Sequence, residues 1–202
     1  LALTQLEERL QAMQFERQQR FNVARDRERA SLPRGCSLGL RWDYRGDIGI
    51  GRETFKDAQH RALLEHVCDF VRQHAPDFKF TTVQVNSSFQ CMLHVDRKNV
   101  GPSLTITVGR HTGGELWIYP KGKLTVQNKL VEFDGNMPHA TCPFTGERFC
   151  LVFYTAVGYD KAAPEDRQRL LDAGMPLPEP GLQRAVYSAP SQRLREAAKV
   201  LP

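Results

Sequence analysis

The stretch HVDRKNVGPSLTITVG, residues 94–109, decides the fold of this chain. Its second half alternates aliphatic residues with Ser, Thr and Gly, which is the period of two expected of a half-buried β-strand. Its first half places His94 and Asp96 two positions apart, and residues at that spacing point to the same side of an extended segment. One imidazole and one carboxylate can therefore reach a single metal ion beside a β-structure.

Four other segments carry a similar β-pattern on either side of this stretch. They contain β-branched and aromatic residues, and clusters of Gly, Pro and Asn separate them, as turns require. The segments cover residues 80–86, 115–119, 129–133 and 148–156, in addition to residues 103–109. Several short strands at this spacing predict a β-sandwich or jelly roll.

Helical patterns flank the β-rich region. Apolar residues recur at intervals of three and four over residues 3–13, which predicts an opening helix that docks on the domain. Residues 54–74 predict a second helix with Thr54 as its cap. Two shorter helices are expected at residues 164–173 and 191–201.

Glycines and Pro33 dominate residues 33–51, which predicts a loop or short-strand region. We therefore divide the chain into three parts. Residues 1–53 are expected to form a helical and loop extension packed on the core, and residues 54–159 the β-core with its support helix. Residues 160–202 are expected to form a Pro-rich helical extension.

The composition is that of a globular protein with a basic surplus. The 202 residues suffice for one domain with a core, and the chain has a net charge of +5 and a pI near 9.1. Such a charge suits a polyanionic partner, although many proteins this basic bind no nucleic acid. The Arg-rich run at residues 17–34 is either a solvated helix face or, less commonly, a phosphate-binding arm. No apolar run approaches the roughly 20 residues that span a bilayer, so we expect no membrane partner.

The five cysteines are scattered without a CxxC pair. An odd number without ligand spacing argues against a disulfide scaffold and against a zinc knuckle. It favours reduced thiols in an intracellular protein, which would be nuclear if the source is eukaryotic. The chain begins with Leu1 rather than Met, so we interpret it as a trimmed chain or a piece of a longer one.

A third metal ligand is expected from His139. It follows the predicted strand 129–133 through a Gly-Asn-Met-Pro turn, which places it at a strand end of the same β-structure. Two His and one carboxylate on one face of a metal leave its other positions open, the arrangement of non-haem Fe(II) oxygenases. We predict that His94, Asp96 and His139 form the metal and catalytic site. No general acid or base is assigned, and His111 is interpreted as an ordinary loop histidine.

Arg148 opens the predicted strand 148–156. Period-two alternation gives this strand one face made of Arg148, Cys150, Val152 and Tyr154. An arginine at the inner end of a strand is costly unless its charge is paired. A carboxylate held by the guanidinium fork removes that cost. This carboxylate belongs either to a 2-oxoacid cosubstrate or to a protein acid such as Glu132 or Glu147.

An HxD pair, a later His after a turn and an Arg opening the next strand occur here in that order. From residue 94 to residue 159 the chain resembles the core of Fe(II)/2-oxoglutarate-dependent dioxygenases. Within that family it is most similar to the TET/JBP group, which oxidises the methyl group of 5-methylcytosine or thymine in nucleic acid. HVDRKN at 94–99 resembles the group's H-x-D-x-x-N, and RFCLVFY at 148–154 resembles its R-x-S-L-V-F-Y. Tyr154 stands where AlkB-type repair enzymes have a second arginine, which disfavours that group.

The resemblance implies a fold, cofactors and residue roles. The fold class is α+β, with a mainly β, double-stranded β-helix (jelly-roll) core and flanking N- and C-terminal helices. The cofactors are Fe(II), 2-oxoglutarate and dioxygen, with ascorbate as a candidate reductant. Arg148 binds 2-oxoglutarate, and Cys150 replaces a serine that commonly helps to hold it, which weakens that contact. Asn99 contacts the target base.

We expect nucleic acid as the partner, DNA rather than RNA, with the target base flipped or single-stranded because a stacked base is out of reach. Arg97, Lys98 and Arg110 lie nearest the site and are expected to contact flanking phosphates. Asn99 has an alternative role, that of stabilising the turn at residues 99–102. The same iron core also suits a hydroxylase of a protein side chain or a small metabolite. A non-catalytic cupin-like binding module is the third alternative.

Overall fold

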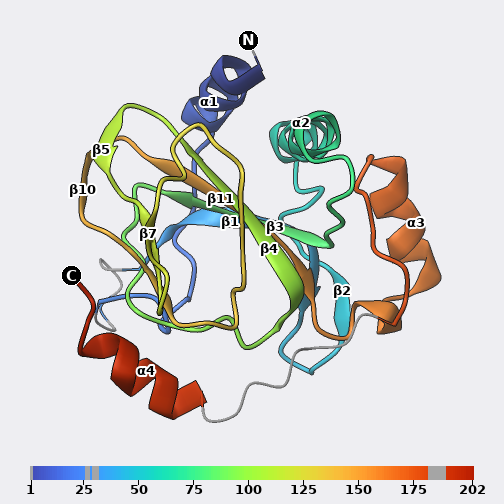
Figure 1. Cartoon of the computed structure of the whole chain (residues 1–202). Helices are drawn as coiled ribbons and strands as arrows, with labels where there is room; N and C mark the ends of the chain where they lie inside the picture. Colours follow the sequence, from blue (N-terminus) through green and yellow to red (C-terminus); the bar gives the residue numbers. More distant parts are fainter. Residues whose placement is uncertain (1, 26–27, 29–31, 182–189) are drawn as a thin grey trace.

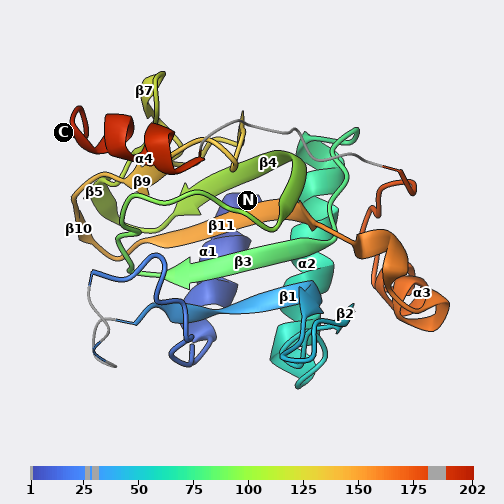
Figure 2. The ribbon, with the colours of Figure 1, turned by 90° about the horizontal axis from the view of Figure 1, so that it is seen from below.

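A six-stranded sheet is the largest unit of the computed structural model, which describes residues 2–25, 28, 32–181 and 190–202. Its strands lie in the order β2-β1-β3-β11-β4-β8, and each neighbouring pair is antiparallel. The bounds are Arg34–Trp42 for β1, Ile48–Ile50 for β2, Thr82–Ser87 for β3, Asn99–Val108 for β4, Val131–Phe133 for β8 and Phe149–Ala156 for β11. Figure 2 shows that strands far apart in the sequence lie side by side in this sheet.

A smaller sheet faces the inner side of the large one. It contains β7, β6 and β9 in that order, with bounds Gly122–Leu124, Leu116–Ile118 and His139–Thr141. A separate pair is formed by β5 (His111–Gly113) and β10 (Phe144–Gly146). Strands β1, β3, β4 and β11 of the large sheet and β6 and β9 of the small sheet line one cavity. Two antiparallel sheets around a central cavity make a double-stranded β-helix, which confirms the predicted fold class.

All five predicted strands are present, as β3, β4, β6, β8 and β11. The segment at residues 33–51, predicted as loop or short strands, instead contributes the nine residues of β1, which lies between β2 and β3. Its glycines allow strands to approach closely: a Cβ on Gly35 would lie 1.9 Å from the carbonyl oxygen of Val85. Gly39 in addition has a φ of +107°. The part of the chain before residue 53 therefore supplies two strands of the large sheet.

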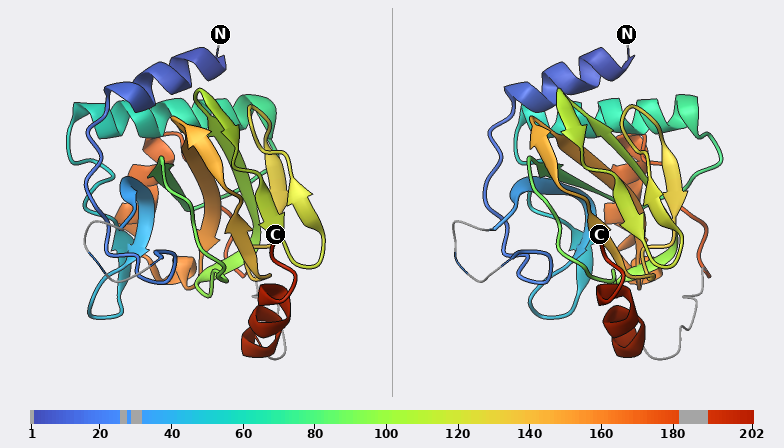
Figure 3. Two further views of the ribbon diagram at one scale, coloured as in Figure 1. Left: turned by 90° about the vertical axis from the view of Figure 1, so that its left-hand side faces the viewer. Right: turned by 60° about the vertical axis from the view of Figure 1, so that its left-hand side comes forward.

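Two helices cover the outer face of the large sheet, as Figures 1 and 3 show. Helix α1 spans Ala2–Ala12 and helix α2 spans Ala58–His74. The main hydrophobic core lies between these helices and the sheet. Its fully buried side chains include Leu6, Leu10, Leu63, Leu64, Val67, Val83, Val85, Leu151 and Phe153. The predicted docking of the opening helix is thus confirmed, and the opposite face of the sheet is left to line the cavity.

Helix α2 begins later than predicted. Its N-cap is Asp57, whose carboxylate accepts a hydrogen bond of 2.9 Å from the His60 amide. Thr54, the predicted cap, is fully buried, and its hydroxyl accepts a hydrogen bond of 3.0 Å from the Gly39 amide. Both residue types suit a cap, and the contact of Thr54 with β1 decides between them.

The helices of the C-terminal region lie on two sides of the molecule (Figure 1). A 3-10 helix (Tyr159–Lys161) and α3 (Pro164–Asp172) follow β11, whereas α4 (Pro190–Ala198) lies on the far side (Figure 1). Ala197 of α4 packs with Trp117 and Cys142 of the small sheet's region in a second, small core. Both predicted C-terminal helices are therefore present. Within the described residues, none of the helices has the length and apolar character that crossing a membrane requires.

Residues 13–25, named here the N-terminal arm, are irregular, so the helix considered for the Arg-rich run is wrong in this part. The arm runs beside the start of β1, where Arg17 and Arg34 form an isolated β-bridge. The remainder of the run lies partly outside the described residues. Arg20 and Asn22 of the arm reach the cavity.

Candidate metal centre and its cavity

A cavity of about 600 Å³ lies between the two sheets. All the residues that the sequence predicted for metal, cosubstrate or substrate line it, except Arg110. These residues are His94, Asp96, Arg97, Lys98, Asn99, His139, Arg148 and Cys150. The fold thus brings three separate sequence motifs to one place.

His94, Asp96 and His139 converge on one point. The two carboxylate oxygens of Asp96 lie 3.5 Å from His94 Nε2 and 3.6 Å from His139 Nε2. The ligand atoms of all three lie within 4.8 Å of one another, and no other such group occurs among the described residues. Two atoms that bind one ion at about 2.1 Å lie at most about 4.2 Å apart, so both His–Asp separations suit a single ion. This His-Asp-His triad fits Fe(II).

Backbone hydrogen bonds hold the two imidazoles in place. His94 and His139 exchange N–H to C=O bonds of 3.0 and 2.9 Å, which join the HxD segment to the start of β9. The Nδ1 atom of His94 lies 2.6 Å from the Met92 carbonyl, and that of His139 lies 2.8 Å from the Met137 carbonyl. A carbonyl only accepts, so each Nδ1 carries the proton and each Nε2 turns a lone pair toward the metal position.

Burial and neighbouring charges set the protonation states of the triad. Burial opposes ionisation of Asp96, but the neighbouring imidazoles of His94 and His139, when protonated, hold the pKa of its carboxyl at about 2. Burial, followed by the charge of His94, lowers the pKa of His139 to about 4. At neutral pH the carboxylate is therefore ionised and the His139 ring is neutral, which are the forms that bind a metal.

Asn99 supports the Asp96 carboxylate from the side of β4. Its Nδ2 donates to Asp96 Oδ2 at 3.2 Å and to Ser103 Oγ at 3.4 Å. Because a carboxylate only accepts, the amide must present its nitrogen to Asp96, which leaves Oδ1 as its acceptor. Gly135 packs against the same group: a Cβ there would lie 3.1 Å from Asp96 Oδ2. Asp96 is thus held on two sides.

Arg148 lies just before β11 and is only 3% exposed. Its Nη2 donates to the Gly114 carbonyl at 2.9 Å, and its Cζ lies 5.3 Å from the centre of the Phe144 ring. Its Nε is buried and has no hydrogen-bond partner among the described residues. The guanidinium is therefore fixed in position, but it still has an N–H donor without a hydrogen-bond acceptor.

The charge of Arg148 also lacks a counter-ion in the described part of the chain. Neither Glu132 nor Glu147 pairs with it. The Glu147 carboxylate instead accepts a hydrogen bond of 2.7 Å from Gln11. Leaving a buried guanidinium unpaired is costly, so its surroundings suit an acid that enters through the cavity. Together with the triad, Arg148 fits 2-oxoglutarate.

Cys150, Val152 and Tyr154 line the cavity beyond Arg148, as the alternation along this strand predicts. The Cys150 Sγ lies 3.6 Å from the Thr105 hydroxyl on the neighbouring strand β4. A hydroxyl group therefore stands beside the thiol on the cavity wall.

Two residues considered in the sequence analysis, His111 and Arg110, lie outside the cavity. His111 is not among the lining residues, and its ring nitrogens lie 3.0 Å from the Gly113 carbonyl and 3.2 Å from the Thr107 hydroxyl. It is a buried residue of strand β5, so the interpretation as a loop histidine is wrong, although it lies outside the cavity. Arg110 is exposed in the turn before β5 and does not line the cavity either. Arg97 and Lys98, by contrast, are exposed lining residues.

Another wall of the cavity was not foreseen. It is formed by Arg20, Asn22, Ser37, Arg41, Gln84 and Asn86. Gln84 and Asn86 alternate with valines in β3, and polar residues at every second position of a buried strand are the signal that could have revealed this wall. Arg20 belongs to the run for which an anion-binding arm was one of two interpretations.

Comparison with solved structures finds distant likenesses. A 2OG-Fe(II) oxygenase family oxidoreductase from Burkholderia pseudomallei is 14% identical over 75% of this chain and 76% of that chain, with a TM-score of 0.43. OsALKBH1 is 12% identical over 76% of this chain and 91% of that chain, with a TM-score of 0.41. A Pseudomonas putida prolyl-4-hydroxylase is 15% identical over 75% and 82%, with a TM-score of 0.41. No protein-family model and no curated protein matches the sequence. At this level of similarity the function has to be inferred from the chain's own residues.

Proposed function

We propose that this chain is an Fe(II)- and 2-oxoglutarate-dependent dioxygenase. The observation that carries the proposal is the buried Arg148 guanidinium, which lines the same cavity as the triad and has no carboxylate partner among the described residues. A His-Asp-His triad alone serves several kinds of metal chemistry. The added cation selects a cosubstrate that carries a carboxylate.

Iron with 2-oxoglutarate and dioxygen supplies the oxidation of an unreactive C–H bond, with release of succinate and carbon dioxide. The chain binds and orients these reactants. His94, Asp96 and His139 would hold the ion, and with three protein ligands other positions would stay open for the cosubstrate and dioxygen. Arg148 holds the distal carboxylate of the cosubstrate through its guanidinium fork, and the two sheets limit access of water. No side chain has to act as a general base, and ascorbate is the candidate reductant.

The proposed target is the methyl group of a pyrimidine base in nucleic acid, DNA rather than RNA. The resemblance of residues 94–99 and 148–154 to the TET/JBP group supports it, as does the position of Asn99 beside the triad. With Nδ2 engaged by Asp96, Asn99 Oδ1 would accept from the 4-amino group of 5-methylcytosine. Thymine carries an acceptor at that position, so this contact favours 5-methylcytosine over thymine. Arg97 and Lys98 would contact flanking phosphates at the cavity rim.

The test combines nucleoside mass spectrometry with a succinate assay. The protein is incubated with Fe(II), 2-oxoglutarate, air and oligonucleotides that contain 5-methylcytosine or thymine, with Asp96→Ala as the inactive control. We expect a hydroxymethylated base and an equivalent amount of succinate. If succinate forms but no oligonucleotide contains an altered base, the oxygenase activity is supported and the nucleic-acid substrate is excluded. No succinate at saturating Fe(II) would remove the oxygenase as well.

A further inference from the structure

The cavity carries more positive charge than the metal chemistry uses. Of the described residues that line it, Asp96 is the one carboxylate, and the cations are Arg20, Arg41, Arg97, Lys98 and Arg148. With Fe(II) and 2-oxoglutarate bound as proposed above, the ion, Asp96, the cosubstrate dianion and Arg148 cancel in charge. The remaining cations then have no anion in the cavity. A substrate that complements this wall is itself anionic.

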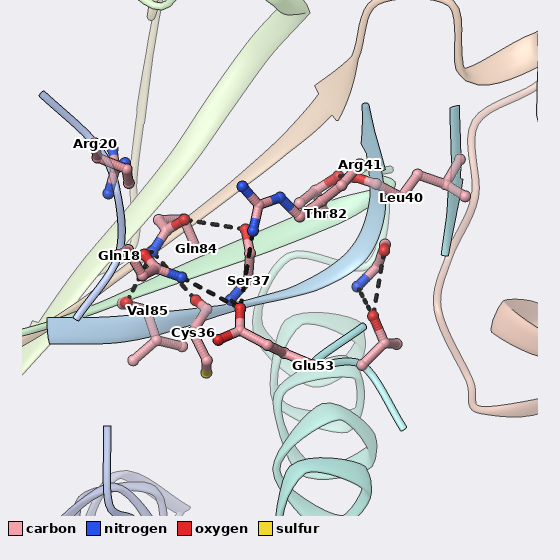
Figure 4. Close-up of polar contacts among 12 residues, drawn as sticks. Gln18, Arg20, Cys36, Ser37, Leu40, Arg41, Glu53, Thr82, Gln84 and Val85 are labelled. Atoms are coloured by element: carbon pink, nitrogen blue, oxygen red, sulfur yellow. Dashed lines mark hydrogen bonds and ion pairs between the residues drawn. The ribbon is translucent and has the colours of Figure 1, made fainter. Parts of the chain in front are cut away.

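Arg20 and Arg41 stand out among these cations because they form the wall built by the N-terminal arm and β1. Figure 4 shows them on the side of β1 away from helix α2, to either side of Gln84. Both arginines line the cavity together with Tyr154, on the cavity side of the large sheet.

Arg20 has no ion pair with an acid of the described residues, and Arg41 has one long ion pair. Arg20 donates at 2.6 Å to the amide oxygen of Asn86, a neutral acceptor, and no ion pair of Arg20 occurs within the described chain. The Nη1 atom of Arg41 lies 3.9 Å from Glu53 Oε2. The same carboxylate oxygen already accepts a hydrogen bond of 2.9 Å from the Ser37 amide. Each guanidinium has five N–H donors, so both retain donors for a ligand.

A buried polar network fastens the N-terminal arm to the sheet (Figure 4). Gln18 donates to Glu53 at 3.3 Å and accepts from the Gln84 amide at 2.8 Å. The same Gln84 nitrogen lies 3.4 Å from the Asn86 oxygen that holds Arg20. Ordering an irregular segment costs conformational entropy, and these bonds offset that cost before a ligand arrives. Arg20 is therefore held in position rather than free to sample solvent.

We propose that Arg20 and Arg41 bind a phosphate group of the substrate, so that the substrate is a nucleotide whose base extends toward the metal. The planar guanidinium fork matches phosphate oxygens in geometry and charge. The phosphate belongs either to a nucleic-acid strand or to a free nucleotide, and the chemistry of recognition is shared. This inference rests on the proposed oxygenase function and names the residues that recognise the substrate's backbone.

The test is calorimetry on the protein loaded with Mn(II) and 2-oxoglutarate in the absence of oxygen. The probes are 5-methyldeoxycytidine, its 5′-monophosphate, and a short single-stranded oligonucleotide with one 5-methylcytosine. We expect one or both phosphate-bearing probes to bind about tenfold or more tightly than the nucleoside. Arg20→Gln and Arg41→Gln should each lose most of that ratio, and the double variant should bring it close to one. Arg61→Gln is the matched control, because Arg61 pairs with Glu65 on the exposed face of α2 and should leave the ratio unchanged.

Lysine variants guard against a folding defect. Arg20→Lys and Arg41→Lys keep the charge and should retain part of the ratio, since a point charge replaces the fork.

For the oligonucleotide, each Gln variant should also reduce the salt dependence of binding by about one unit of slope. A gain confined to the oligonucleotide identifies a strand, and a gain with the monophosphate admits a free nucleotide. The phosphate-binding proposal is overturned if the parent binds all probes with equal affinity, or if the double variant keeps the parent's ratio. In either case, binding of 2-oxoglutarate would still support the proposed oxygenase function. Absence of 2-oxoglutarate binding overturns both.

Discussion

The wall of the cavity around Arg148 and the wall around Arg20 both present arginines, but they are built in different ways. Arg148 directly precedes the regular strand β11, and it lines the cavity together with Cys150, Val152 and Tyr154 of that strand. Arg20 lies in an irregular arm, and contacts of Gln18 with Glu53 and Gln84 hold that arm in place. The backbone thus orients one arginine, and side chains from remote segments orient the other.

This difference separates chemistry from substrate choice. The metal ligands and Arg148 stand on or beside paired strands, so they move only if the sheets move. The N-terminal arm can change in sequence without disturbing those strands, as loops on a rigid scaffold generally do. We therefore expect variants at the two walls to have separable effects on cosubstrate and substrate binding.

Loss of a triad ligand should have the largest effect. His94→Ala and Asp96→Ala each leave two ligands, and we expect Mn(II) binding and succinate formation to fall below detection in both. The fold should persist, because the main core lies on the opposite face of the large sheet. Mn(II) titration followed by electron paramagnetic resonance, with circular dichroism for the fold, measures both. Asp47→Ala, which removes an exposed carboxylate before β2, is the control. Unchanged Mn(II) affinity in both ligand variants would exclude this site.

Arg148→Ala should have the next largest effect. A desolvated charge-assisted pair is lost, so we expect the affinity for 2-oxoglutarate to fall about a hundredfold. Arg148→Lys should recover part of it. Calorimetry on the Mn(II)-loaded protein provides the measurement, and Arg110→Ala, an exposed arginine outside the cavity, is the control. If 2-oxoglutarate binds Arg148→Ala as it binds the parent, another residue holds the cosubstrate.

Asn99→Ala tests whether the metal side of the cavity also reads the base. The Asp96 carboxylate loses a donor, so we expect metal affinity to fall about tenfold, and the assay therefore uses saturating Fe(II). Under that condition base oxidation should fall strongly, whereas decarboxylation of 2-oxoglutarate without substrate should persist. Ser103→Ala removes the other partner of the Asn99 amide without removing the amide itself, and it is the matched control. Equal oxidation of both oligonucleotides by Asn99→Ala and the parent would assign Asn99 to support of Asp96 alone.

Gln18→Ala should have the smallest effect and is the most direct test of the comparison. The arm loses its bonds to Glu53 and Gln84, so Arg20 is less well ordered. We expect the free energy of unfolding to fall by about 1 kcal/mol, and the preference for phosphate-bearing probes to fall severalfold. Gln19→Ala, at an exposed position of the same arm, should change neither quantity. A parallel fall in 2-oxoglutarate affinity would show that the two walls are not independent.

The sequence by itself determined the features that depend on local periodicity and spacing. Alternation located all five predicted strands, including the cavity face of β11. The spacing of His94 and Asp96, together with the turn before His139, predicted a triad whose members the structure brings together. These inferences succeed because side-chain direction in an extended segment follows from position alone.

Only the tertiary structure decided the features that depend on a remote partner. Gly35 is a residue type typical of loops, but here it allows β1 to lie close to β3. Thr54 has the chemistry of a cap, yet its hydroxyl is used by Gly39 of β1, and Asp57 caps α2 instead. Arg20 reaches the cavity because buried amides from another part of the chain hold its arm. A local pattern carries the direction of a side chain but not the identity of its neighbour, and in each of these cases the neighbour decides.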